Sequence, residues 1–153
     1  MNGTSGDLIS NRRATHQYEI LETYEAGIVL TGTEIKSLRE REASLQDSYV
    51  KVIKNELILV NSSISPYKFG NVYNHEDRRE RKLLMHKREI AKLKVSTQEK
   101  GLTIIPLAFF LKDGRAKVRL ALAKGKKTFD KRASIKERDD KREIQRSIKT
   151  KLQ

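Results

Sequence analysis

The sequence predicts a mostly β fold, an OB-fold-like antiparallel β-barrel with two or three flanking helices and a flexible basic C-terminal tail. Three observations support this prediction. Short segments of alternating apolar and polar residues recur along the chain, clusters of turn-forming residues separate them, and helical patterns lie between them. About five or six short, mostly antiparallel strands favour a closed or partly closed barrel, of which the OB-fold is the leading case.

The 153 residues divide into three expected regions. We expect a disordered lead over residues 1–10, a barrel over residues 11–123 and a basic tail over residues 124–153. The chain has no cysteine, which excludes thiolate zinc sites and cysteine nucleophiles. No apolar run reaches the ~18 residues of a membrane span, and the N-terminus lacks the apolar region of a signal peptide. We therefore expect a cytoplasmic monomer that makes no contact with a membrane and uses no cofactor.

Charge is the strongest functional signal in the sequence. The formal net charge is +13. Residues 124–153 carry twelve Lys and Arg against five Asp and Glu, a net charge of +7, and the remaining residues carry +6. Such a charge distribution favours a polyanionic partner, most often nucleic acid. The alternative is a basic surface that serves only solubility.

The first predicted strand covers residues 18–30, where YEILETYEAGIVL alternates with period two. Thr33 is the expected N-cap of a short helix over residues 33–42, with Ile35 and Leu38 on its buried side. Residues 48–60 predict two further strands with a turn at Asn55–Glu56. The following residues, 61–77, are rich in Ser, Gly and Asn and predict a loop.

Residues 78–94, RRERKLLMHKREIAKLK, are predicted to form a helix. At about 100° per residue, one half of this helix collects Leu83, Leu84, Ile90, Ala91 and Leu93. The other half collects Arg78, Arg81, Arg88 and Lys92. A rigid cationic row can match several phosphates at once, so these cations and the neighbouring Lys82 are candidate RNA-binding residues. A solvated helix face is the alternative.

Two later segments, GLTIIPLAFFL and AKVRLALA, flank Asp113–Gly114, a dipeptide typical of two-residue hairpins. Pro106 indicates that the first of these strands lies at an edge or carries a bulge. In the second strand, the residues expected to face inward are Ala116, Val118, Leu120 and Leu122. Those expected to face outward are Arg115, Lys117 and Arg119, which form either a binding surface or an ordinary solvated face.

The loop PYKFGNVYNH sets four ring-bearing side chains around Lys68, namely Tyr67, Phe69, Tyr73 and His75. Exposed rings can stack on unpaired bases while a cation holds the backbone. The alternative is that one or two of these rings plug the end of the barrel.

Catalysis receives little support. His16, His75 and His86 are scattered, with no metal-ligand spacing, and the adjacent residues His75-Glu76-Asp77 rarely converge on one ion. The segment GKKT at 125–128 is similar to the end of a phosphate-binding loop, but Leu120 stands where that loop needs a glycine. We therefore expect a protein that is not an enzyme.

The tail has a thin apolar stripe formed by Ile144, Ile148 and Leu152, at i, i+4 and i+8. A solitary helix of this length is marginal in water. We therefore expect the tail to be disordered when free and to become helical against an anionic partner. A tail that is present only for solubility is the alternative.

Several blocks of the sequence, taken together, resemble the SsrA-binding protein (SmpB) family. In chain order they are NRRATHQYEI, EAGIVLTGTEIKSLRE, DSYVKV, RRERKLLMHKREI and GRAKVRLALAKGKKTFDKR. The resemblance runs from about Asn11 to the end of the chain. It implies an OB-type barrel that binds the tRNA-like domain of transfer-messenger RNA (tmRNA), and a tail that is disordered in isolation.

The same resemblance implies a role in trans-translation. With elongation factor Tu, such a protein brings aminoacylated tmRNA to a ribosome stalled without a stop codon, so elongation factor Tu is an indirect partner. The tail is then expected to fold at the 16S rRNA decoding centre and in the vacant mRNA channel. Two alternatives stay open: a ribosomal protein with a permanently threaded tail, and an RNA-processing enzyme that uses its histidines.

Position by position, the resemblance implies tmRNA binding by Asn11, Glu25 and Leu84. The tail motif required on the ribosome matches Gly125, Lys126, Lys127, Asp130, Lys131 and Arg132, and Phe129 lies within this motif. Two positions depart from the family pattern. Asp77 stands where the family often has proline, and Phe129 stands where it often has histidine or tyrosine.

Overall fold

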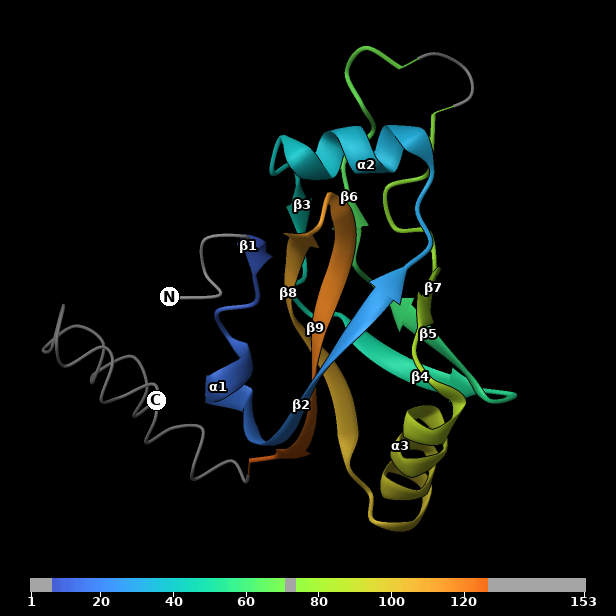
Figure 1. The fold of residues 1–153 in the computed structure, drawn as a ribbon. Coiled ribbons are helices and arrows are strands. Elements are labelled where there is room, and N and C mark those ends of the chain that lie inside the picture. The colour runs from blue at the N-terminus through green and yellow to red at the C-terminus, as the bar shows by residue number, and fades with distance from the viewer. Residues whose placement is uncertain (1–6, 71–73, 127–153) are drawn as a thin grey trace, which may run out of the picture.

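The computed structural model describes residues 7–70 and 74–126, which form nine strands and three helices (Figure 1). The strands are β1 (Asp7–Ser10), β2 (Tyr18–Ile28), β3 (Ala43–Ser44), β4 (Tyr49–Ile53), β5 (Glu56–Val60), β6 (Ser63–Ile64), β7 (Arg81–Leu84), β8 (Thr103–Lys112) and β9 (Arg115–Gly125). The helices are α1 (Ala14–Gln17), α2 (Gly32–Arg39) and α3 (Lys87–Glu99). No helix in this part of the chain is long and apolar enough to cross a membrane.

The main sheet closes on itself. Its strand order is β1-β8-β4-β5-β7-β2-β9, and β8 also pairs with β9, so the strands from β8 round to β9 form a barrel. All of these pairings are antiparallel, and β3 and β6 form a separate two-stranded sheet. Helices α2 and α3 lie at opposite ends of the barrel (Figure 1). The predicted antiparallel barrel with flanking helices is confirmed.

The core follows from the period-two alternation of the strands. On β9, Val118 and Leu120 are fully buried, as predicted, while Arg115 is exposed. Leu38 of α2 and Leu93 of α3 pack into the same core cluster. Each helix therefore buries one apolar side against an end of the barrel.

Both predicted hairpins are present, one of them shifted by a residue. Asp113 and Gly114 have positive φ values of 53° and 76°, as a type I′ turn requires, so the hairpin predicted there is confirmed. In the other hairpin Ile53 pairs with Glu56, and Lys54 and Asn55 take φ values of 50° and 64°. The turn is therefore Lys54–Asn55, one residue earlier than predicted.

Strand β8 carries the bulge that Pro106 indicated. The register of β8 against β9 shifts between Pro106 and Ala108. The proline lies inside the barrel wall, because β8 pairs with β9 on one side and with β1 and β4 on the other. The alternative, an edge strand, is wrong.

Helix α2 begins earlier than predicted. Its N-cap is Thr31, whose side chain accepts a hydrogen bond from the backbone N–H of Glu34, while the Glu34 carboxylate accepts one from the Thr31 N–H. This reciprocal pair is a capping box. The prediction of Thr33 as N-cap is wrong because only Thr31 has a glutamate three residues ahead.

The prediction of one helix over residues 78–94 is also wrong. Residues Arg81–Leu84 form strand β7, which pairs with β5 and β2, and helix α3 begins only at Lys87. Within β7, Arg81 and Leu83 are buried while Lys82 and Leu84 are exposed. Closure of the barrel thus overrides the helix-forming composition of this segment.

Both ends of the barrel extend beyond the predicted boundaries. Asp7–Ser10 was expected to belong to a disordered lead but forms strand β1, which pairs with β8. Arg119 of β9 forms an ion pair with Asp7 at 3.2 Å. Strand β9 continues past Ala123 to Gly125. The predicted disorder of residues 1–6 and the predicted states of residues 127–153 lie outside the described residues.

Candidate RNA-binding interface

The outer face of β9, β2 and β7 carries two of the three residues implied to bind tmRNA. Ala26 is buried, so its neighbours Glu25 and Gly27 on β2 face outward. Gly27 pairs with Leu84 of β7 on one side and with Lys117 of β9 on the other. The glycine has no side chain, so the surface is hollow between Leu84 and Lys117.

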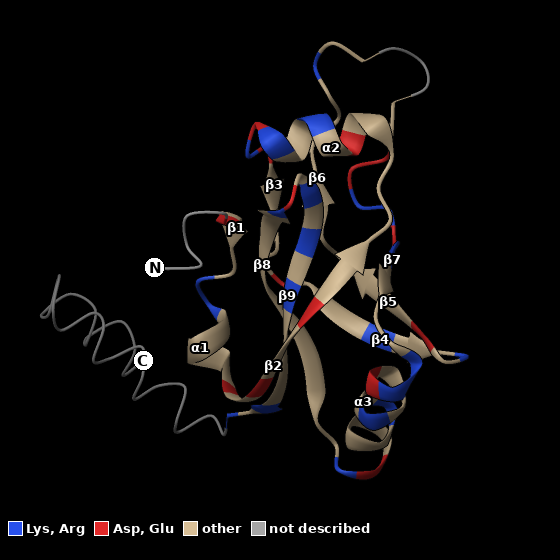
Figure 2. Cartoon of the chain, in the orientation of Figure 1, with Lys and Arg blue, Asp and Glu red and all other residues tan. Residues whose placement is uncertain are grey.

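This hollow belongs to a groove of about 590 Å³ between α2, the end of β2, β7 and the β8–β9 hairpin. The residues that line the groove are Gly27, Ile28, Val29, Leu30, Ile35, Arg39, Leu84, Gly114, Arg115, Ala116 and Lys117. The floor is apolar, the charged residues are all cations, and none of the lining residues is acidic. Figure 2 shows Lys and Arg along β9 and on α2, two of the elements that contribute residues to this groove. Such a surface suits a base or ribose on the floor and phosphates at the rim.

Leu84 forms an apolar ridge beside the groove. Its side chain is 51% exposed, and it also lines a second hollow of about 600 Å³ between β7 and α3. An aliphatic side chain that stands between two hollows can pack against an unstacked base on either side. The structure thus leaves Leu84 accessible, as the RNA-binding prediction requires.

Glu25 lies next to the groove and is paired with a cation. Its carboxylate accepts a hydrogen bond from Lys112 at 3.0 Å. The arginine opposite it, Arg119, binds Asp7 and lies 4.9 Å from the centre of the Phe110 ring. The described contacts of the Glu25 carboxylate therefore include a lysine and no arginine.

Asn11 lies elsewhere, on the bulge of β8. Its side-chain amide donates to the carbonyl oxygen of Pro106 at 2.9 Å. Its backbone N–H donates to the carbonyl oxygen of Leu107 at 2.8 Å. The bulge interrupts the hydrogen-bond ladder of β8 at these residues, and Asn11 gives a donor to the carbonyls of Pro106 and Leu107. Strand β9 separates Asn11 from Glu25 on β2, so the structure does not bring Asn11 beside Leu84.

The predicted cationic row is not a single face. Arg88 and Lys92 are exposed at i and i+4 on α3, but Arg78 lies in the turn before β7. Lys82 is paired with Glu56 at 2.6 Å. Arg81 is fully buried, so its guanidinium does not face the surface. The row is therefore wrong as a geometric prediction.

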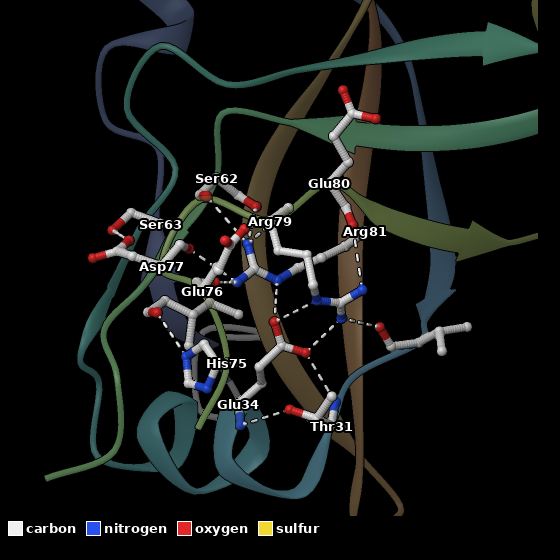
Figure 3. Close-up of polar contacts among 12 residues, drawn as sticks. Thr31, Glu34, Ser62, Ser63, His75, Glu76, Asp77, Arg79, Glu80 and Arg81 are labelled. Carbon is white, nitrogen blue, oxygen red and sulfur yellow. Dashed lines mark hydrogen bonds and ion pairs between the residues drawn. The ribbon is translucent and has the colours of Figure 1, made fainter. Parts of the chain in front are cut away.

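Arg81 instead belongs to a buried ion cluster with Glu34 and Arg79 (Figure 3). Arg81 donates to Glu34 at 2.7 Å, and Arg79 donates to the other carboxylate oxygen at 2.6 Å. The Arg81 guanidinium also donates to the carbonyls of Ser62 and Asp77, at 3.1 and 3.0 Å. Burial alone would raise the pKa of Glu34, but hydrogen bonds from Arg79, the Thr31 N–H and Arg81 lower it to about 2.

The buried ion cluster positions the walls of the groove. It joins Glu34, in the first turn of α2, to β7 and to the segment before β7. From these elements Ile35 and Leu84 enter the groove. The sequence offered one signal for this arrangement, the capping box at Thr31 and Glu34. The arginine partners lie 45 and 47 residues away and gave no local signal.

The histidines occupy three separate places. His16 lies on α1, His75 lies between β6 and β7, and His86 is the N-cap of α3. His75 bonds to Thr33 through Nδ1 and to the Ile64 carbonyl through Nε2, so Nε2 carries a proton. Among the described residues, no group of three histidines and carboxylates could hold a metal ion.

Two residues of the tail motif are described. Gly125 ends β9 opposite Tyr18. The backbone N–H of Lys126 donates to the Gln17 carbonyl at 3.0 Å, and its Nζ donates to the Thr15 carbonyl at 2.7 Å. The chain thus stays on the barrel through Lys126. The other motif residues, Lys127, Phe129, Asp130, Lys131 and Arg132, lie outside the described part.

A small closed barrel with an apolar groove edged by cations defines a nucleic-acid-binding protein of the OB type. A family model described as "SmpB protein" matches residues 8–150, so the chain belongs to the SmpB family. The SsrA-binding protein of Protochlamydia amoebophila is 66% identical over 97% of this chain and 97% of that protein. The SsrA-binding protein of Chlamydia trachomatis is 55% identical over 94% of this chain and 95% of that protein.

A solved structure gives the same result. A chain from "tmRNA-SmpB: a journey to the center of the bacterial ribosome" is 47% identical, with a TM-score of 0.67, and the match covers 82% of this chain and 92% of that chain. The resemblance noted in the sequence is therefore confirmed.

Proposed function

We propose that this chain binds the tRNA-like domain of tmRNA and delivers it to stalled ribosomes for trans-translation. The observation that carries the proposal is identity over nearly the whole chain, at up to 66%, to proteins named SsrA-binding protein. The solved relative whose name joins tmRNA, SmpB and the bacterial ribosome supports the same partners. The chain acts as an RNA-binding adaptor in the cytoplasm and catalyses no reaction. Elongation factor Tu meets it indirectly, through aminoacylated tmRNA.

The groove beside Leu84 is the part of the barrel that fits tmRNA best. Leu84 and Val29 are 51% and 46% exposed and offer an apolar surface to a base or ribose. Arg39, Arg115 and Lys117 stand around them and can contact phosphates. Glu25, next to the groove, can accept a hydrogen bond from a base in place of the one from Lys112.

The tail carries the second function. Residues 124–153 hold a net charge of +7 and few apolar residues. In this proposal the chain leaves the barrel after Lys126, and the motif that begins at Gly125 contacts the 16S rRNA decoding centre. The remaining residues fold into a helix in the vacant mRNA channel. Two RNA surfaces are thus bound by two separate parts of one chain.

Deletion of residues 131–153 tests this division. The truncated chain keeps every described residue, so we expect its affinity for purified tmRNA to stay within a few fold of the full chain. Tagging of peptides on stalled ribosomes, measured in a reconstituted translation reaction, should be abolished.

Two results would count against the proposal. If the full chain does not bind tmRNA in a gel-shift titration, the proposed function is wrong. If the full chain binds and the truncated chain does not, the function stands but the division between barrel and tail is wrong.

A further inference from the structure

The segment between β6 and β7 presents an aromatic pair that the groove does not use. Phe69 is 75% exposed, the highest exposure among the large hydrophobic side chains of the described residues. Its ring meets Tyr67 edge to face, with 5.6 Å between the ring centres. A phenyl ring in water forgoes the free energy of burial, so this position is unfavourable for the isolated barrel and suits a partner that covers the ring.

Two lysines accompany the rings. Lys68 Nζ lies 5.5 Å from the centre of the Phe69 ring, and Lys36 Nζ on α2 lies 5.5 Å from the centre of the Tyr67 ring. A flat apolar face with cations beside it matches a nucleotide, whose base is flat and whose phosphate is negative. Charge complementarity therefore favours RNA over an apolar protein segment.

The described part of this segment is held in shape. Asn74 donates to the Tyr67 carbonyl at 2.8 Å and accepts from the Tyr67 N–H at 3.1 Å. A Cβ added at Gly70 would lie 2.4 Å from the Asn74 amide nitrogen and 3.1 Å from the Tyr67 carbonyl oxygen, so a side chain there would disturb this clamp. A platform whose shape is fixed before binding loses less conformational entropy when it binds.

Helix α2 separates this platform from the groove. Ile35 and Arg39 of α2 line the groove, whereas the adjacent Lys36 lies over Tyr67. In Figure 1 the described residues that follow β6 rise beyond α2, on the side away from the barrel. An RNA strand that leaves the groove across α2 therefore meets the rings next.

We propose that Phe69 stacks on an unpaired base of the same tmRNA that occupies the groove, while Lys68 and Lys36 contact neighbouring phosphates. This inference rests on the proposed function and adds a second contact to it. Tyr67 supports the Phe69 ring from its edge. The Watson–Crick edge of the base needs no partner in the protein, because stacking alone tolerates any base.

The test compares Phe69→Leu with Phe69→Tyr in the full chain. Leucine keeps an apolar side chain but removes the ring, and tyrosine keeps the ring. Because Phe69 is exposed, both variants should unfold at the wild-type temperature. We expect Phe69→Leu to weaken tmRNA binding by about 5- to 150-fold, the range for loss of one base stack, and Phe69→Tyr to bind as the wild type does. One tmRNA base that the wild type protects from chemical modification should react in the Phe69→Leu complex.

The outcomes separate this inference from the proposed function. If wild-type protein does not bind tmRNA, the proposed function fails. If wild type binds and Phe69→Leu binds equally well with an unchanged modification pattern, the stacking proposal is overturned. If Phe69→Leu binds tmRNA normally but loses affinity for ribosomes purified without tmRNA, the ring faces ribosomal RNA and the assignment to tmRNA is wrong. A loss in Phe69→Tyr equal to that in Phe69→Leu would likewise overturn stacking.

Discussion

Glu34 holds two guanidinium groups at the junction of α2 and β7. Its side chain is fully buried, as is that of Arg81, while Arg79 is partly exposed. Burial lowers the pKa of Arg81 and its bond to Glu34 opposes that effect, so both groups stay charged. Removing one partner of a buried pair costs roughly 3–5 kcal/mol, because the other charge is left unpaired. The Glu34–Arg81 pair also holds the first turn of α2 against β7, beside the groove.

Glu34→Gln should destabilise the protein at neutral pH and remove part of its acid sensitivity. The pKa of Glu34 lies at about 2 in the folded chain, against 4.5 for the unperturbed group. Its stabilisation is therefore complete above pH 4.5 and is lost as the pH falls toward 2, a loss of about 3 kcal/mol. The free energy of unfolding, measured by urea denaturation at several pH values from 6 to 2, tests this loss. The wild type should show this loss and Glu34→Gln should not.

Glu56→Gln is the matched control for this experiment. Glu56 pairs with Lys82, but both side chains are about half exposed, at 49% and 48%. Exposed pairs contribute about 0–1 kcal/mol, so this variant should unfold nearly as the wild type does. Equal acid slopes in the wild type and in Glu34→Gln would refute the role assigned to Glu34.

At the scale of elements, β2 and β7 make the groove by leaving one position empty. Gly27 faces outward between Leu84 and Lys117. A Cβ added at Gly27 would lie 3.4 Å from the Leu84 Cβ, which is ordinary van der Waals contact. The glycine therefore avoids no clash; its effect is to leave space next to Leu84, where an RNA group can lie.

Leu84→Ala should weaken tmRNA binding without unfolding the protein. Leu84 is already half exposed, so its truncation costs little stability. It loses contact area with the RNA, and we expect affinity to fall about five- to tenfold. Val95→Ala on α3 is the control, because Val95 is 46% exposed and lies outside the groove. Gel-shift titration measures both; equal losses in the two variants would show that the groove is not the interface.

The elements also show which features the sequence could predict. The Asp113–Gly114 hairpin and the inward and outward sides of β9 depend on neighbouring residues, and their predictions are confirmed. Strand β7 could not be found this way, because its residues favour helix and only pairing with β2 and β5 makes them a strand. The candidate site also contains residues that could be predicted and residues that could not. Leu84 was named from the family pattern, whereas the groove cation Arg39 was missed because α2 meets the β8–β9 hairpin only in the fold.

At the scale of the whole molecule, ion pairs are unevenly distributed over the barrel. Some of the cations away from the groove pair with carboxylates, as in Lys51–Glu80 and Lys82–Glu56. Negative charge also gathers near Tyr24, whose pKa is raised to about 12 by burial, by its hydrogen bond to Glu22 and by the nearby Glu89. None of the ion pairs among the described residues includes Arg39, Arg115 or Lys117. The three cations that line the groove therefore have no carboxylate partner among the described residues.

The unpaired cations of the groove give a prediction for salt. If Arg39, Arg115 and Lys117 each contact one phosphate, and Lys36 and Lys68 do the same beyond α2, the plot of log affinity against log salt should have a slope of about −4. Residues 131–153 add a net charge of +5 to the full chain, but in the proposed division they bind ribosomal RNA instead of tmRNA. The full chain and the chain lacking residues 131–153 should therefore show the same slope against tmRNA, measured by fluorescence anisotropy from about 50 to 200 mM salt. A slope several units steeper for the full chain would mean that the tail also lies on tmRNA, because each additional phosphate contact releases further counterions.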